Sequence, residues 1–264
     1  TCCLALFYLG YKALLSKETF FRFNRIVLVA GMLVCMLLPF AGIRTASPGV
    51  LQMPLQQLEE MIAEEMGEAV SRQAEAPTEA VDVAQESVSW GELIVCLYFV
   101  GIVIGTGLLA RSFISLLWLI RSGRKVRRED YTLVLVNRAV APFNWGRYIV
   151  LSLKDYSDYP DEILTHELVH LRKRHSLDLI YAEVIVLLHW FNPAAWLLKR
   201  ELQEVHEYQA DMGVLKSGIN ATKYQLLLVK KAVSASSYTF ANSFNHSKIK
   251  KRITMMLKEK SNSW

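Results

Sequence analysis

The stretch His166-Glu167-Leu168-Val169-His170 contains the residue types that metal-dependent hydrolysis requires. If the stretch is helical, the two histidines lie four residues apart on one face, and both imidazoles can approach one ion. Two imidazoles suit Zn²⁺, which takes a third protein ligand and leaves a position for water. Glu167 adjoins the first histidine and can accept a proton from that water. The motif therefore predicts a site for one Zn²⁺ ion and hydrolysis by a metal-activated water.

The flanking residues predict the helix that this motif needs. Pro160 followed by Asp161 and Glu162 is typical of a helix start. The longer zinc pattern H-E-x-x-H-x-x-G-x-x-H is excluded, because Lys173 and Ser176 stand where it requires glycine and histidine. An apolar stripe beside the histidines indicates a packed helix and comprises Leu164, Leu168 and Leu171.

A second helix, predicted over residues 200–211, offers candidates for the third ligand. Glu207 and Asp211 lie four residues apart on one face. One carboxylate could bind the metal while the other accepts the free ring N–H of a ligand histidine. His206, Glu204 and Glu201 are alternative third ligands, and His206 is the strongest of them because imidazole also suits zinc. Spacing alone leaves the choice between Glu207 and His206 open.

These motifs together resemble the M56 membrane metallopeptidases, the family of the BlaR1 and MecR1 antibiotic-sensing receptors. The resemblance rests on the H-E-x-x-H stretch, on Glu207-x-x-x-Asp211, and on His189-Trp190-Phe191-Asn192-Pro193 between them. It implies zinc ligands at His166, His170 and Glu207, a catalytic base at Glu167 and a ligand-orienting acid at Asp211. It also implies a protein or peptide substrate, either a cytoplasmic transcriptional repressor or the chain itself. Tyr208, His206 and nearby Arg or Lys are candidates for stabilising the developing oxyanion.

Residues 129–153 predict a small sheet before the zinc motif. Residues 131–136 and 148–153 are rich in β-formers, and residues 142–146 carry turn chemistry. Metallopeptidases with this helix plan hold the substrate as a strand added to an edge strand, and the resemblance suggests that role for the second segment. The residues concerned are Tyr148, Ile149, Val150 and Leu151. An ordinary structural hairpin is the alternative.

Composition independently indicates a membrane protein. Hydrophobic residues make up 52% of the chain, and the mean hydropathy is +0.22. Residues 26–43 and 93–110 form nearly uncharged runs, each about long enough to cross ~30 Å of hydrocarbon. Residues 1–11 are apolar and read as the end of a further span. Three spans are therefore predicted before the zinc motif.

Charge predicts the orientation of these spans. Basic residues dominate the loop between the first two spans and the segment after the third, which places both in the cytoplasm. Residues 44–89 hold nine acidic and two basic residues, a net charge of −7, on the opposite side. The formal charge of +5 on the whole chain is then explained by topology and by anionic membrane lipid, without direct nucleic-acid binding.

The predicted fold is a set of membrane α-helical spans plus a mixed α+β, gluzincin-like zinc metallopeptidase domain. Residues 1–43 form two transmembrane helices with a short basic cytoplasmic loop, 44–89 an acidic extracytoplasmic loop, 90–121 a third transmembrane helix, and 122–264 the cytoplasmic peptidase domain. The predicted protein is a multi-pass, signal-transducing zinc endopeptidase of the inner (cytoplasmic) membrane. Two alternatives stay open: a membrane quality-control protease of the M48 type, and a non-catalytic signalling scaffold. The intact Glu167 speaks against the scaffold.

Overall fold

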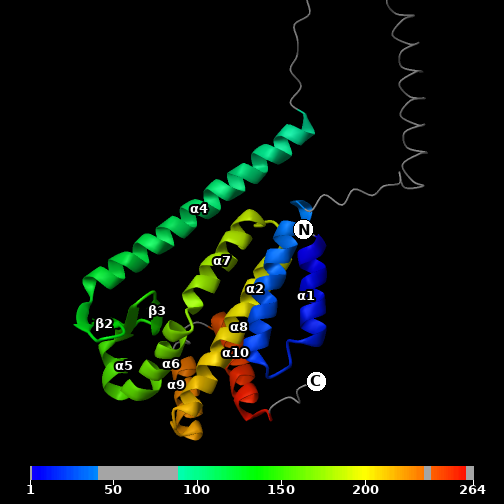
Figure 1. The fold of residues 1–264 in the computed structure, drawn as a ribbon. Helices are drawn as coiled ribbons and strands as arrows, with labels where there is room; N and C mark the ends of the chain where they lie inside the picture. Colours follow the sequence, from blue (N-terminus) through cyan, green and yellow to red (C-terminus); the bar gives the residue numbers. More distant parts are fainter. Residues whose placement is uncertain (1, 41–88, 235–238, 260–264) are drawn as a thin grey trace, which may run out of the picture. The chain divides into compact units, whose positions relative to one another are not determined.

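The fold is described from a computed structural model, which places residues 2–40, 89–234 and 239–259 (Figure 1). The chain divides into two compact units. One contains residues 1–36 and 97–264, and it holds the sheet and the candidate site. The other contains residues 37–96. The predicted acidic extracytoplasmic loop at 44–89 falls almost entirely outside the described residues, so it stays a prediction.

A four-stranded mixed sheet precedes the helices of the site. The spatial order is β1-β2-β4-β3, in which β2 and β4 are parallel and both outer pairs are antiparallel. The strands are β1 (Arg124–Arg127), β2 (Thr132–Val136), β3 (Phe143–Trp145) and β4 (Tyr148–Ser152). The two strands predicted from sequence are β2 and β4, but β1 and β3 were not predicted as strands.

The prediction that residues 148–151 form an edge strand is wrong. β4 lies inside the sheet, between β2 and β3. Ile149, Val150 and Leu151 are each 0% exposed, as expected for a strand covered on both faces. The edge position belongs to β3, a three-residue strand in the segment that carried turn chemistry. Tyr148, Ile149 and Val150 therefore have strand partners on both sides, and Leu151 pairs with β2 alone.

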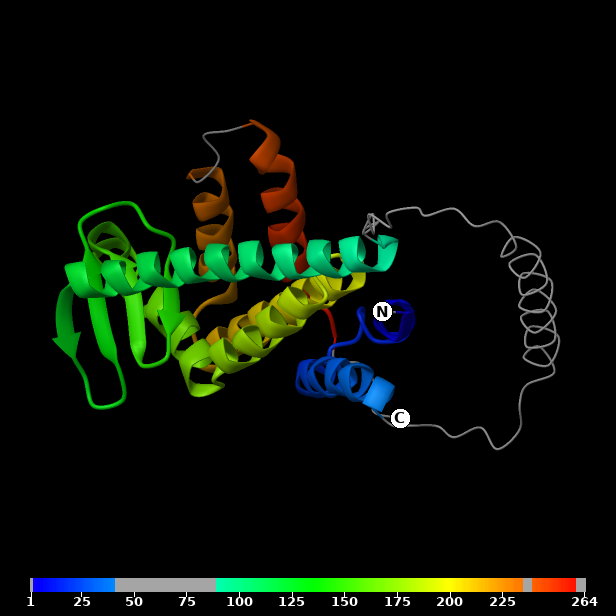
Figure 2. The same ribbon diagram turned by 90° about the horizontal axis from the view of Figure 1, so that it is seen from above.

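Alternating side chains divide the sheet into two packed faces. Leu133, Leu135, Ile149 and Leu151 point to a core shared with α6 (Pro160–Arg172) and α9 (Ala221–Ser234). Val134, Val136 and Val150 point the other way, to Ile120 near the end of α4 (Trp90–Ser122). Helix α4 passes across the strands in Figure 2. The sheet is thus held between the end of a long apolar helix and the helices of the site.

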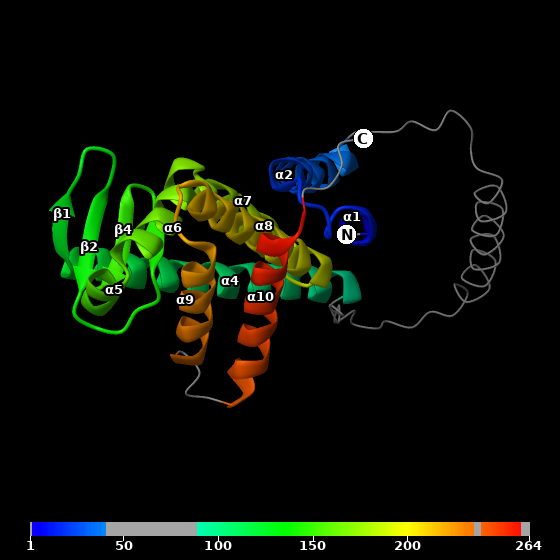
Figure 3. The same ribbon diagram turned by 90° about the horizontal axis from the view of Figure 1, so that it is seen from below.

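Helix α8 (Pro193–Lys216) is the central element of the helical part. It packs against α6, α7 and α10, and also against α1 near the start of the chain. α9 and α10 lie side by side in Figure 3. The remaining helices in this part are α5 (Leu153–Asp158), α7 (His175–Leu188) and α10 (Thr239–Leu257).

The start of the chain forms two antiparallel helices, α1 (Cys2–Leu14) and α2 (Phe21–Leu37), followed by the short 3₁₀ turn η1 (Leu38–Phe40). Leu4 and Leu28 pack in one core with Leu198 and Leu202 of α8. The two helices, called here the N-terminal hairpin, are therefore integrated with the helix that carries the second zinc motif.

One helix among the described residues, α4, is long and apolar enough to cross a membrane. Its bounds, 90–122, agree closely with the predicted third span. α1 is apolar but shorter than a span, and α2 has 17 residues. The two spans predicted within residues 1–43 accordingly stay predictions.

Candidate metal centre

Helix α6 places the H-E-x-x-H motif as its start and end signals predict. Pro160 occupies the first turn, where a missing N–H costs nothing, and two acids follow it. The helix ends at Arg172, and Arg174 adopts a left-handed conformation (φ 55°) that turns the chain into α7. Within the helix, the Nε2 atoms of His166 and His170 lie 3.2 Å apart. Both imidazoles therefore present the same nitrogen to one point.

Glu207 of α8 completes a three-ligand cluster. Its Oε2 lies 3.5 Å from His166 Nε2, and its Oε1 lies 3.6 Å from His170 Nε2. Tetrahedral zinc with bonds of 2.0–2.1 Å requires its ligand atoms to be about 3.3 Å apart. The separations of 3.2, 3.5 and 3.6 Å match that requirement. The residues thus fit a zinc ion, with His166, His170 and Glu207 as the group able to hold it.

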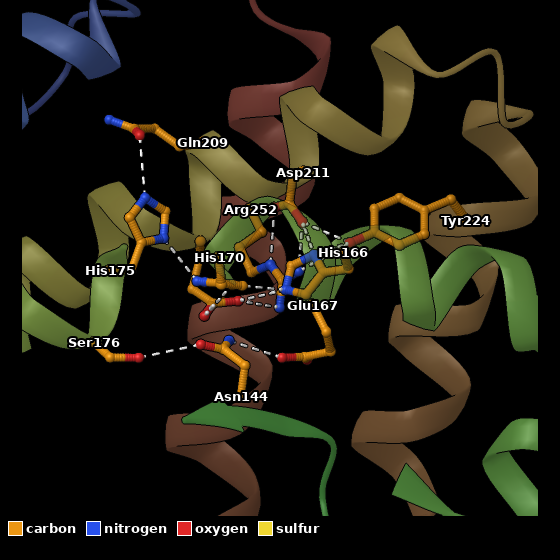
Figure 4. Close-up of polar contacts among 11 residues, drawn as sticks. Asn144, His166, Glu167, His170, His175, Ser176, Gln209, Asp211, Tyr224 and Arg252 are labelled. Atoms are coloured by element: carbon orange, nitrogen blue, oxygen red, sulfur yellow. Dashed lines mark hydrogen bonds and ion pairs between the residues drawn. The ribbon is translucent and has the colours of Figure 1, made fainter. Parts of the chain in front are cut away.

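A tyrosine joins His166 to Asp211. The Tyr224 hydroxyl lies 2.8 Å from His166 Nδ1 and donates a hydrogen bond of 2.8 Å to Asp211 Oδ1. The direct distance from His166 Nδ1 to Asp211 Oδ1 is longer, 3.6 Å. The sequence predicted that Asp211 accepts the imidazole N–H directly; the structure inserts a hydroxyl between them (Figure 4).

Arg252 of α10 binds both acids of α8. Its Nη1 lies 2.9 Å from Glu207 Oε2, and its Nε donates to Asp211 Oδ2 at 2.9 Å. Burial raises the pKa of Glu207, but the hydrogen bond with His166 and the charge of Arg252 outweigh it, so the pKa lies well below its usual range. Glu207 is therefore a carboxylate, as a metal ligand must be.

The two histidines differ in their electrostatic environment. Burial, together with the nearby His166, lowers the pKa of His170 to about 3. Burial also lowers the pKa of His166, but contact with Glu207 outweighs it and raises the pKa overall. His170 is thus neutral and ready to bind metal.

Glu167 is held by a short polar relay on the β3 side. The Asn144 amide donates to Glu167 Oε2 at 3.0 Å, and the Ser176 hydroxyl donates to Asn144 Oδ1 at 3.2 Å (Figure 4). Glu167 is 6% exposed, and burial raises its pKa above the usual range, against the effects of His166 and Asn144. A carboxylate with a raised pKa is a better proton acceptor, which suits a general base.

Two residues predicted near the reaction centre lie elsewhere. His206 is 2% exposed, and its Nε2 lies 2.8 Å from Asp178 Oδ2. Tyr208 packs on the ring of Phe21, and its hydroxyl donates to Glu204. Each residue neighbours Glu207 in sequence, so the helix turns its side chain by about 100° away from the cluster. The structure therefore contradicts both as oxyanion stabilisers, and it does not bring His206 into the ligand cluster.

Sequence reasoning missed three residues of the site: Asn144, Tyr224 and Arg252. Asn144 lay in a segment interpreted as a turn. Arg252 and Tyr224 lay within the predicted peptidase domain, with no pattern to distinguish them. Each comes from an element far from the motif in sequence, so only the packing of β3, α9 and α10 brings them to it.

Comparison with known proteins identifies the segment that holds this site. Residues 144–256 match the family model described as BlaR1 peptidase M56. The chain is also similar to the regulatory protein BlaR1 of Bacillus licheniformis, with 28% identity over 123 residues, which is 42% of this chain and 20% of that protein. The matched region spans only about a fifth of the relative's length, and the segment that matches the family includes every site residue from Asn144 to Arg252. Residues 144–256 are therefore similar to the M56 peptidase family, and part of the chain is similar to BlaR1.

Proposed function

We propose that this chain is a membrane zinc endopeptidase of the receptor type, which cleaves a cytoplasmic regulator or itself. The observation that carries the proposal is the convergence of His166, His170 and Glu207 at zinc-like spacing, with Glu167 beside them. A non-catalytic scaffold would have no need to bury that carboxylate and hold it by the Asn144 amide. The relation to BlaR1 supports a sensor-like role.

The side chains divide the proposed reaction between them. Zinc bound by the three ligands would polarise the scissile carbonyl and acidify a water molecule. Glu167 takes a proton from that water and delivers it to the leaving amine. The Asn144 amide fixes one carboxylate oxygen, so the other is oriented for the transfer. Arg252 and Tyr224 keep the acids and His166 in position throughout.

β3 is the element that would hold the substrate. Among the described strands it pairs with β4 alone, so its other edge offers backbone groups to an extended peptide. Asn144, in the middle of β3, touches Glu167. A peptide added along β3 would therefore pass beside the proposed base. Backbone recognition of this kind tolerates varied side chains.

The membrane placement is part of the proposal. α4 carries exposed apolar residues along its length, and Trp190 at the end of α7 donates to the Tyr98 carbonyl of α4. Apolar side chains on and just after α7 are also exposed, namely Leu177, Ile180, Val184 and Phe191. This apolar surface suits lipid. We propose that residues 44–89 lie outside and that residues 122–264 face the cytoplasm, except for α7 and Trp190, which lie against α4 in the lipid.

Cysteine labelling tests the orientation. In a background with Cys2, Cys3, Cys35 and Cys96 replaced by serine, Ala76→Cys should react with an impermeant thiol reagent on intact cells. Ser217→Cys, at an exposed site after α8, should react only after lysis. The reverse labelling would place the peptidase outside, where it could not cut a cytoplasmic regulator.

Metal removal tests the activity. The purified chain in detergent should contain about one zinc per molecule and should cleave itself or fluorescein-labelled casein. A chelator should abolish cleavage, and added Zn²⁺ but not Mg²⁺ should restore it, because imidazole ligands favour zinc. Zinc binding without cleavage of either substrate would favour the scaffold, and cleavage that survives zinc removal would exclude the mechanism.

A further inference from the structure

A buried chain of hydrogen bonds runs from the back of His170 to the N-terminal hairpin. His170 Nδ1 lies 2.8 Å from His175 Nδ1, and His175 Nε2 lies 3.2 Å from Gln209 Oε1. Gln209 Nε2 in turn donates to the carbonyl oxygen of Phe21 at 2.7 Å. His175 is 1% exposed and Gln209 is 3% exposed. Figure 4 shows His170, His175 and Gln209 in line.

The direction of every bond in this chain follows from its end. A backbone carbonyl can only accept, so Gln209 must turn its NH₂ toward Phe21 and its oxygen toward His175. The oxygen also accepts from Lys173 Nζ at 2.9 Å, which agrees with that orientation. An amide oxygen cannot donate, so His175 Nε2 carries the hydrogen. In a neutral imidazole the other nitrogen, Nδ1, is then an acceptor.

The same logic fixes the tautomer of the metal ligand. His175 Nδ1 accepts, so His170 Nδ1 must donate and carry the hydrogen. His170 Nε2 is then left with its lone pair, and this is the nitrogen that faces His166 and Glu207. Reversing the bond between the histidines would put the hydrogen on His170 Nε2, where it would block metal binding. The hydrogen bonds from His170 to Gln209 must therefore run in this one direction if His170 is to bind a metal ion.

The other histidine is oriented by a separate group. Asp211 can only accept, so Tyr224 donates to it and accepts from His166 Nδ1. His166 Nε2 is thereby left free for the metal. That second chain ends at Arg252 of α10, whereas the His170 chain ends at α2. His170 is thus oriented by a helix near the start of the polypeptide, and His166 by a helix near its end.

We propose that His175 and Gln209 are positioning residues that fix the metal-binding tautomer of His170 and tie it to the N-terminal hairpin. The inference rests on the proposed function only in taking His170 as a metal ligand. A second contact supports the link to the hairpin. Arg25 of α2 binds Asp178 Oδ2 at 2.6 Å and the Lys173 carbonyl at 2.9 Å, on either side of His175 in sequence. Displacement of α2 would therefore disturb the groups that orient His170.

A pair of substitutions at His175 separates orientation from packing. His175→Leu fills the site but offers no acceptor, so the zinc dissociation constant should rise by roughly 10–100-fold. His175→Asn keeps an oxygen on Cγ, close to the position of Nδ1, and should restore most of the affinity. His189→Leu is the matched control, because His189 lies at the far end of α7 and bonds its own helix at Ile185. It should bind zinc like the parent protein.

Competition with a chromophoric chelator measures these constants on the full chain in detergent, and circular dichroism of the zinc-free protein checks the fold. If His175→Leu does not fold, a pair of substitutions at Gln209, the hydrogen-bond partner of His175, tests the same role. Gln209→Met should weaken zinc binding, whereas Gln209→Glu keeps an acceptor for His175 and should not. Parent-like affinity in the folded Leu and Met variants would overturn the proposal. So would equal losses in both members of a pair.

Two further measurements separate this inference from the metal site itself. His170→Ala should lose most zinc affinity; if it does not, His170 is no ligand and the proposed function fails instead. In the zinc-free protein labelled with ¹⁵N-histidine, the His170 signal should report a hydrogen on Nδ1, as assigned by its loss in His170→Ala. Observation of the Nε2–H tautomer in a protein that still requires His170 for zinc would sink the positioning role alone.

Discussion

Helices α8 and α4 distribute polar and apolar residues in opposite ways. α8 buries charged and polar side chains, among them Glu201, Gln209 and Asp211. α4 has 33 residues, of which Ile120 alone is buried, and it exposes a long series of large apolar side chains. In α8 these three side chains have hydrogen-bond partners, which offset the cost of leaving water. The exposed apolar side chains of α4 suit lipid, as the proposed span requires. Burial follows from available partners, and hydrophobicity alone does not determine it.

Glu167→Gln tests the chemistry of the polar site beside α8, and it should have the largest effect on activity. Glutamine is nearly isosteric and Glu167 is not a proposed ligand, so fold and zinc content should stay as in the parent protein. Proteolysis should fall by roughly 10²–10⁴-fold because the general base is lost. Cleavage rates of matched, zinc-loaded samples give the answer, and equal rates would exclude Glu167 as the base.

The next largest effect should come from the ligand on α8. Glu207→Ala should lose most bound zinc, since it removes one of three protein ligands. His206→Ala is the neighbouring control and should retain zinc, because that imidazole binds Asp178 and does not enter the cluster. Metal analysis after gel filtration distinguishes the two. Zinc loss in His206→Ala with retention in Glu207→Ala would reverse the ligand assignment.

Tyr224→Phe should have a moderate effect. It removes the hydroxyl between His166 and Asp211 without changing the ring that packs in the core. Zinc affinity should fall by roughly 10–100-fold, as is usual when the group that orients a ligand is lost. Tyr131→Phe is a suitable control, since that ring packs in the same core and is not part of the cluster. Similar zinc affinities in the two variants would show that Tyr224 does not orient His166.

A matched pair of valines tests the comparison between α8 and α4 directly. Val205 of α8 is 2% exposed, and Val103 of α4 is 70% exposed. Val205→Ala should cost about 1–3 kcal/mol of folding stability, because it leaves a cavity. Val103→Ala should cost little, since neighbouring protein does not cover the side chain. Thermal unfolding in detergent measures both, and an equal loss would mean that α4 is covered by protein rather than by lipid.

A charge at the same position on α4 sharpens the test. If Val103 lies near the centre of a span, Val103→Asp should make the free energy of membrane insertion less favourable by about 2.5–3.5 kcal/mol. Fractionation of cells would then show less of the variant in the membrane. Lys216→Asp, at the exposed end of α8, should be found in the membrane fraction in the same amount as the parent protein. Unchanged insertion of Val103→Asp would argue against α4 as a span.

The sequence by itself determined the features that depend on neighbours along the chain. Helical periodicity placed His166 beside His170 and Glu207 on the same face as Asp211, and Pro160 marked the start of α6. The bounds predicted for the third span, 90–121, agree with those of α4 to within a residue. These signals are local, because a helix fixes which residues three or four apart share a face.

Tertiary structure alone decided which elements meet. The sequence gives no indication that a three-residue strand takes the sheet edge, or that Tyr224 stands between His166 and Asp211. It also left open whether Glu207 or His206 faces the histidines. That choice depends on how α8 is rotated against α6, and packing with α1, α7 and α10 sets the rotation. Contacts between residues far apart in sequence follow from the burial of whole helix faces, which no local pattern encodes.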